Sequence, residues 1–305
     1  MFFRNLTLFR FSPAVSSDLA RLDDALTTHR LRACGPLDMS TRGFVPPVVH
    51  GTDETLTHAV RQCTLLAVGR EDKLLPAQVV NEELQRKVRA IAGEQGRQVG
   101  GRERRRIKDE LLGELLPRAF VRASRIAAYV DKQHGWLVLD TSSRKSAEEA
   151  LTQIRGALGS FPAVPLAPAT SPRLLMTEWL SSGHLPAGLR LGDECELRDP
   201  VTATGAIVRC RRQDLDAEEV REHLRNGKQV FLLGLVLDER IGFVLGEDLV
   251  IRKLKFLDVV TDGLGDGAGD AEAEMDASFA LLSLELAQLL AKLDKWFGLP
   301  RPTDS

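Results

Sequence analysis

The chain has 305 residues, 43% of them hydrophobic and 28% charged, and a formal net charge of −2 at pH 7. This composition is ordinary for a globular protein with a buried core. No apolar run approaches the roughly 18 residues that span a bilayer, and the N-terminus lacks a basic-then-apolar signal pattern. The four cysteines form no Cys-x-x-Cys pair, which argues against zinc and fits reduced thiols. We therefore expect a cytoplasmic protein with no membrane partner and no cofactor.

The first quarter of the chain alternates strand-like and helical segments. Phe2–Phe11 interleaves apolar and polar residues, as in a strand, and Ser16–Asp18 is a capping signal for a helix that runs to about His29. Residues 35–51 contain Pro46 and Pro47 and are expected to form a loop. Thr64–Gly69 is an apolar strand.

A basic helical arm is predicted over residues 76–116. One helix starts at Pro76, and a second runs from about Arg102 to Leu116, with glycines at 93, 96, 100 and 101 between them. Residues 85–125 hold 12 Lys and Arg against five Asp and Glu. A local positive charge on a mildly acidic chain is typical of a polyanion-binding surface, although a solvated helix face explains it equally well.

The pattern beyond the arm predicts a hairpin, a helix and then a break. Strands over 126–130 and 136–140 flank a turn, and the sequence from Ser146 to Glu149 is a capping box for a helix that ends at Leu158. Residues 161–172 hold four prolines and read as an extended connection. We therefore expect an N-terminal domain over 1–160 and a C-terminal domain over 173–305.

The second half repeats this mixed style. Residues 258–276 hold seven Asp and Glu and no Lys or Arg, so they are expected to form a solvated acidic loop. The fold class is therefore α+β, with mixed antiparallel sheets, helices and the projecting arm. The other elements expected are helices over 176–181, 216–226 and 277–297 and strands over 194–197, 206–210, 229–237 and 241–245.

A second basic group lies in this half. Arg209 and Arg211 fall two residues apart in a predicted strand, so they share one face of a sheet. Cations gathered on one sheet surface contact phosphates without reading bases, although charges scattered in different directions would fit the same sequence. The complete group is Arg209, Arg211, Arg212, Lys228, Arg252, Lys253 and Lys255.

The mode of binding expected from these residues is sequence-tolerant binding of duplex DNA. No helix-turn-helix or zinc-finger pattern offers base readout. Aromatic residues make up only 5% of the chain, which leaves few side chains for stacking single-stranded bases.

Enzymatic patterns are sparse, and the chain is predicted not to be an enzyme. There is no phosphate-binding loop of the Gly-x-x-x-x-Gly-Lys type, no His pair with metal-ligand spacing and no Gly-x-Ser-x-Gly turn. One pattern is left as an alternative. Glu71 and Lys73 after a strand, with Asp53 upstream, resemble the residues by which many nucleases hold Mg²⁺.

Short motifs spread over nearly the whole chain resemble the bacterial recombination-associated RdgC family. The most informative is Leu-Leu-Pro-Arg-Ala-Phe at 115–120, preceded by Lys-Asp-Glu at 108–110. Further motifs in the same order lie at 3–6, 43–47, 56–58, 73–76, 145–149, 158–162, 177–179, 212–215 and 252–256.

The resemblance implies a nucleoid-associated protein that forms a ring-shaped homodimer around duplex DNA and restrains the RecA recombinase. It also implies that Phe120 is a contact residue between subunits and adds Arg118 to the DNA-binding residues. From the residues alone, Phe120 fits a core position equally well. The C-terminal helix would supply a second contact or only the core. A third possibility is a protein-interaction module whose basic arm binds an acidic partner.

Overall fold

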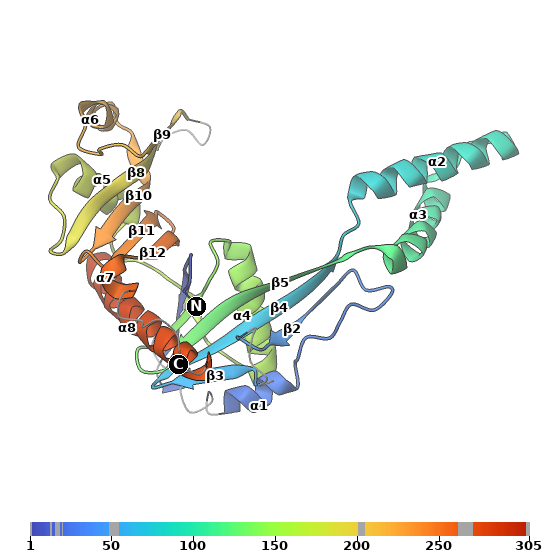
Figure 1. Cartoon of the computed structure of the whole chain (residues 1–305). Helices are drawn as coiled ribbons and strands as arrows, with labels where there is room; N and C mark the ends of the chain where they lie inside the picture. Colours follow the sequence, from blue (N-terminus) through green and yellow to red (C-terminus); the bar gives the residue numbers. More distant parts are fainter. Residues whose placement is uncertain are drawn as a thin grey trace.

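The computed structural model combines two antiparallel sheets, a long C-terminal helix and a projecting helical arm (Figure 1). It confirms the α+β class. The residues that it describes are 2–12, 14–15, 19, 21–48, 55–200, 205–261 and 271–302.

The first sheet has seven strands and is built around two long ones, β4 (Cys63–Lys73) and β5 (Val121–Asp131), which pair along their full length. Their central residues are buried on both faces, as the apolar runs around Leu66 and Tyr129 require. The remaining strands are β1 (Thr7–Arg10), β2 (Ser40–Val45), β3 (Thr57–Val60), β6 (Trp136–Leu139) and β7 (Val164–Pro165), in the order β2-β4-β5-β6-β1-β7 with β3 also on β4.

The second sheet has five strands in the order β12-β11-β10-β8-β9. Its central strand β10 is rich in Leu and Val and places residues such as Leu233 and Leu235 in the core. One face of the sheet therefore packs inward and the other is available for function. The strands are β8 (Leu189–Arg198), β9 (Ile207–Arg211), β10 (Gln229–Leu237), β11 (Ile241–Gly246) and β12 (Ile251–Phe256).

Helices arrange these sheets in layers. The outer face of the seven-stranded sheet packs on α1 (Leu22–Thr27) and α4 (Arg144–Leu158). The C-terminal helix α8 (Ala271–Phe297) packs against its other face and against the five-stranded sheet, so one continuous core contains residues from both halves. The helices α5 (Pro172–Ser182) and α6 (Glu218–Arg225) complete that core.

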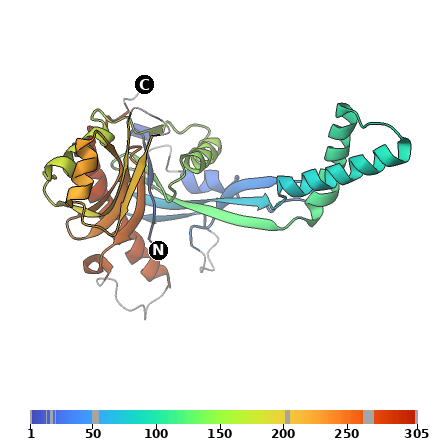
Figure 2. The same ribbon diagram turned by 90° about the horizontal axis from the view of Figure 1, so that it is seen from above.

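The arm stands at the end of β4 and β5, far from the five-stranded sheet in both views (Figures 1 and 2). It consists of α2 (Ala77–Gln95) and α3 (Gly101–Leu115), followed by a 3₁₀ turn, η2 (Leu116–Arg118). Both predicted arm helices are thus confirmed. The arm has its own small core of Val80, Leu84, Ile107 and Leu111.

Three local predictions are wrong. Residues 40–45, expected in a loop, form β2 because each pairs with a residue of β4 from Asp72 to Ala67. The cap of α4 is Ser143, whose hydroxyl accepts the Ser146 N–H, so Ser146 is the third residue of that helix and not its cap. Part of the acidic segment 258–276 is helical, because α7 (Asp258–Thr261) and the start of α8 lie within it.

Other boundaries shifted without changing the type of element. The first helix starts at Leu22, and the predicted capping residues 16–18 lie outside the described residues. The segment 252–255, expected to follow a strand pair, forms β12 itself. The division into domains at 161–172 stays a prediction.

Candidate nucleic-acid interface

One face of the five-stranded sheet carries a row of cations on its edge strand. Within β9, Arg209 and Arg211 are exposed while Cys210 between them is buried in the core. The register places Glu196 of β8 opposite Arg209 and Glu194 opposite Arg211. The predicted shared face of the two arginines is therefore present, and acidic side chains of β8 lie beside them.

The opposite edge strand adds cations to the same face. Arg252 lies opposite Val244 and Lys255 opposite Gly242, both on the side away from the buried Ile251. A bulge at Lys253, with φ of 53°, turns its side chain onto this face as well, where its Nζ bonds to Glu194. We call this surface the open face. It comprises Glu194, Glu196, Arg198, Arg209, Arg211, Arg252, Lys253 and Lys255.

The other predicted DNA-binding residues lie outside the paired strands that form the open face. Arg212 is exposed directly after β9 with φ of 53°, and Lys228 is half-buried in the turn before β10. Arg118 is exposed in η2 at the base of the arm. The structure thus brings five of the eight predicted residues together.

Carboxylates neutralise part of the open face. Arg209 donates from Nε to Glu196 at 2.6 Å, and Arg198 donates to the same carboxylate at 2.7 Å. Burial alone would raise the pKa of Glu196, but these hydrogen bonds outweigh it and hold the pKa below its usual value. Glu196 is therefore charged at neutral pH and orients both guanidinium groups.

The open face nevertheless keeps a positive excess. Asp248 bonds to both terminal nitrogens of Arg252, at 3.1 and 2.8 Å. The six cations of the open face are balanced by its two carboxylates, Glu194 and Glu196, and by the neighbouring Asp248. The net charge of these groups is therefore +3. Within the described residues, Arg211 and Lys255 make no ion pair, so their donors are available to phosphate.

Sequence analysis missed Arg198, Glu194 and Glu196. Arg198 ends β8, and its guanidinium also lies 4.8 Å from the centre of the Phe231 ring. The signal was the alternation Glu194, Glu196, Arg198, which places all three on one face of a strand. Their partners in β9 depend on strand register and were not readable from spacing.

Phe120 projects at the base of the arm, where its side chain is 83% exposed. The carbonyl of Phe120 accepts the N–H of Leu74. This bond joins the residue that follows β4 to the residue that precedes β5. Leu74 and Val121 are also exposed apolar residues. The core position considered for Phe120 is wrong, and a role in contact between subunits stays a prediction.

The residues of the nuclease alternative are only partly described. Glu71 accepts the backbone N–H of Cys34 at 2.8 Å, and Asp53 lies outside the described residues. Across the part of the chain that the structure describes, no group of three His, Cys, Asp or Glu side chains is arranged to hold a metal ion. The described helices include none with the length and apolar character needed to cross a membrane.

Comparison with known proteins gives consistent matches along the whole chain. A family model described as "RdgC: Putative exonuclease, RdgC" matches residues 1–299. The recombination-associated protein RdgC of Xanthomonas axonopodis pv. citri is 50% identical over 295 residues, which cover 96% of this chain and 97% of that protein. The protein of the same name from Stenotrophomonas maltophilia is 48% identical over 302 residues, 99% of each chain.

The chain belongs to the RdgC family. The resemblance seen in its short motifs is thus confirmed, and a recombination-associated role is supported by the names of its relatives. The motif at 115–120 that carried most of the resemblance ends in the exposed Phe120, and the motif at 252–256 is nearly the whole of β12. Two of the motifs shared with the family therefore include exposed residues as well as core residues.

Proposed function

We propose that this RdgC-family protein binds duplex DNA of the nucleoid through phosphate contacts and without sequence preference. The observation that carries the proposal is the open face, where the cations contributed by both edge strands outnumber the carboxylates. The backbone of β11 is accessible on that side at Gly242, where an added methyl group would meet no atom within 4 Å. A cationic sheet surface fits a phosphate backbone better than base edges.

We further propose that the protein acts as a homodimer that closes into a ring around the duplex. Phe120 at the arm base is the proposed contact of one junction, since an exposed aromatic beside other apolar residues is typical of an interface anchor. A closed ring would restrain RecA by occupying duplex DNA. The arm and the five-stranded sheet stand at opposite ends of the molecule (Figure 2), as two ends of a half-ring would.

Affinity measured against salt concentration tests the DNA proposal. We expect tight, sequence-indifferent binding to a short random duplex, weaker binding to the matching single strand, and a log–log slope of about −0.9 per neutralised phosphate. The double variant Arg211→Ala, Lys255→Ala should weaken binding and make the slope shallower by about 2 units. Absence of binding at low salt would remove the proposal, and unchanged binding in the variant would remove the open face.

The ring is tested separately by the release of DNA. Dissociation from closed circular DNA should be much slower than from a short linear duplex, because a ring leaves a linear molecule by sliding off its ends. Equal rates on both would leave DNA binding intact and remove the ring.

Two other functions are kept as alternatives. The description of the matching family model favours an exonuclease. Digestion of linear duplex in the presence of Mg²⁺, lost in the variant Glu71→Ala, would establish it. For a protein-interaction module, charge reversal at Arg104, Arg105 and Arg106 of α3 would leave DNA binding unchanged.

A further inference from the structure

A cleft lined with arginine lies where β4 and β5 leave the body of the protein for the arm. It has a volume of about 380 Å³ and opens on the α4 side of the seven-stranded sheet. Its walls come from β2, β4, β5 and the first turns of α4. Three guanidinium groups line it, those of Arg42, Arg70 and Arg122, because Arg125, which also borders the cleft, alternates to the other face of β5.

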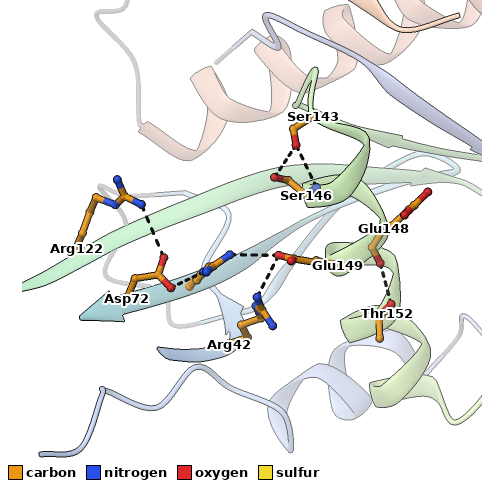
Figure 3. Close-up of polar contacts among 9 residues, drawn as sticks. Arg42, Asp72, Arg122, Ser143, Ser146, Glu148, Glu149 and Thr152 are labelled. Carbon is orange, nitrogen blue, oxygen red and sulfur yellow. Dashed lines mark hydrogen bonds and ion pairs between the residues drawn. The ribbon is translucent and has the colours of Figure 1, made fainter. Parts of the chain in front are cut away.

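Two of these arginines are held in place by carboxylates (Figure 3). Glu149 of α4 accepts from Arg42 at 3.1 Å and from Arg70 at 3.2 Å. Asp72 accepts from Nε of Arg70 at 2.7 Å. Because each arginine has five N–H donors in a rigid fork, these bonds leave further donors on both side chains. The carboxylates therefore orient Arg42 and Arg70 without exhausting them.

The third arginine is less engaged. Arg122 is 66% exposed and lies 4.0 Å from Asp72, beyond hydrogen-bond distance. The hydroxyls of Ser124, Thr141 and Ser146 also line the cleft.

The charge balance of the cleft favours an anion. Its third carboxylate, Asp140, accepts the backbone N–H groups of Arg4 and Asn5, both at 2.9 Å, and is thus committed elsewhere. Three arginines then face two carboxylates that are directed at them. Ser146 lies in the first turn of α4, where the helix dipole adds positive potential. Arginine with hydroxyl donors is a typical environment for phosphate, which accepts paired N–H bonds.

We propose that this cleft binds a phosphate group, with Arg122 as its direct donor and Ser124 as a supporting donor. Arg42 and Arg70 supply fixed charge behind them. The phosphate belongs either to a DNA backbone or to a free phosphate anion, and in the first case the inference rests on the proposed function. The cleft is on a different sheet from the open face, so it is a second site and not an extension of the first.

Methyl NMR of the full chain tests the cleft directly. Ile126 lines the cleft, whereas Ile207 is exposed on β9 beside the open face, so labelled isoleucine methyl groups report each site separately. Inorganic phosphate and a short random duplex are titrated in turn, each against sodium chloride at the same ionic strength. The expected result is a saturable shift of Ile126 with at least one of the two, and no shift with chloride.

The variant Arg122→Ala should abolish that shift or weaken apparent affinity at least about tenfold, since the charge-assisted bonds of its guanidinium group are lost. It leaves the bonds of Glu149 and Asp72 to Arg42 and Arg70 in place. Lys295→Ala, an exposed cation on α8, is the matched control and should not change the Ile126 response. The other isoleucine signals report whether each variant keeps its fold.

The outcomes separate the source of phosphate and the two proposals. A shift of Ile126 with phosphate alone assigns a small anion, and a shift with duplex assigns the DNA backbone. No shift of Ile126 with either ligand, or a shift that survives in Arg122→Ala, overturns the cleft. If the Ile207 signal shifts with duplex in that case, the proposed function stands. If the Ile126 signal shifts with duplex and the Ile207 signal does not, only the open face is removed.

Discussion

At the scale of single residues, Glu196 restrains the open face that it helps to build. Its carboxylate orients Arg198 and Arg209 but also cancels part of their charge. The variant Glu196→Gln should bind duplex DNA several-fold more tightly with a steeper salt dependence, because one negative charge is removed. Fluorescence anisotropy over a range of salt checks this. Glu222→Gln, on the exposed side of α6, should bind as the wild type does.

The same substitution should lower stability in a pH-dependent way. We expect a loss of about 1–3 kcal/mol at neutral pH, because a buried carboxylate that accepts from two guanidinium groups is replaced by a neutral amide. The pKa of Glu196 is depressed in the folded state, so its contribution is present at neutral pH and is lost as pH falls through that pKa. The stabilities of both proteins from urea denaturation should therefore converge only once pH falls below the depressed pKa of Glu196. A difference that persists there would show that the amide disturbs packing instead.

Buried thiols give a second prediction at this scale. Burial, with a further contribution from Asp131, raises the pKa of Cys63 to about 12, and burial raises that of Cys195 still further. Because thiolate is the reactive form, both should alkylate at least about a thousandfold more slowly than a free cysteine at about pH 8. Mass spectrometry after iodoacetamide treatment reads out each site. Unfolding in guanidinium chloride is the control and should make all four cysteines react.

These thiols also make stability fall at high pH. The thiol of Cys63 has a higher pKa folded than unfolded, so its contribution is complete below about pH 8.5 and is lost as pH rises toward 12.

At the scale of elements, α8 joins the two sheets into one core. Leu286 is fully buried between them, whereas Leu284 on the same helix is 49% exposed. Leu286→Ala should lower the free energy of unfolding by about 2–5 kcal/mol, and Leu284→Ala should change it little. Circular dichroism during urea denaturation gives both values. Equal losses would mean that α8 does not bury the face seen here.

Ion pairs fix the position of this helix as well. Arg240, at the turn between β10 and β11, bonds to the buried Glu285, and Arg10 of β1 lies 3.2 Å from Asp294. One pair reaches each sheet, so α8 is tied to both. Arg10 also lies over the ring of Trp136 at 4.0 Å, which compensates part of its burial.

Local patterns in the sequence were sufficient for elements that depend on nearby residues. Gly96 ends α2 in a left-handed conformation with φ of 62°, and Gly159 ends α4 with a positive φ of 73°. The period of two in Arg209 and Arg211 was likewise enough to place both on one face. Each of these signals acts within a few residues.

Predictions failed where distant segments decide the outcome. Residues 40–45 form a strand because β4 offers a partner edge, and Gly43 permits the close approach, since a Cβ there would lie 2.5 Å from the backbone nitrogen of Leu31. The pairing of Glu196 with Arg209 and of Lys253 with Glu194 depends on register across several strands. No spacing along the chain encodes such contacts.

At the scale of the whole molecule, the arm and the open face are separated by the seven-stranded sheet (Figure 1). The arm has its own small core and joins the body through β4 and β5, which the cleft at Glu149 borders. An assembly that uses both the arm and the open face requires β4 and β5 to hold the arm in a fixed orientation relative to the body. The contacts of Glu149 with β2 and β4 supply part of that restraint.

The last prediction concerns self-association through the arm base. Phe120→Ala should leave the stability of the subunit within about 0.5 kcal/mol of wild type, because the side chain is exposed and contributes nothing to the core. If it anchors a junction, truncation should weaken dimer formation by at least tenfold, as loss of an aromatic anchor costs about 2 kcal/mol or more. Sedimentation equilibrium measures the dissociation constant, with Val79→Ala, exposed on α2, as the control. A dimer unchanged by Phe120→Ala would place the junction elsewhere, while binding to short duplexes through the open face would remain.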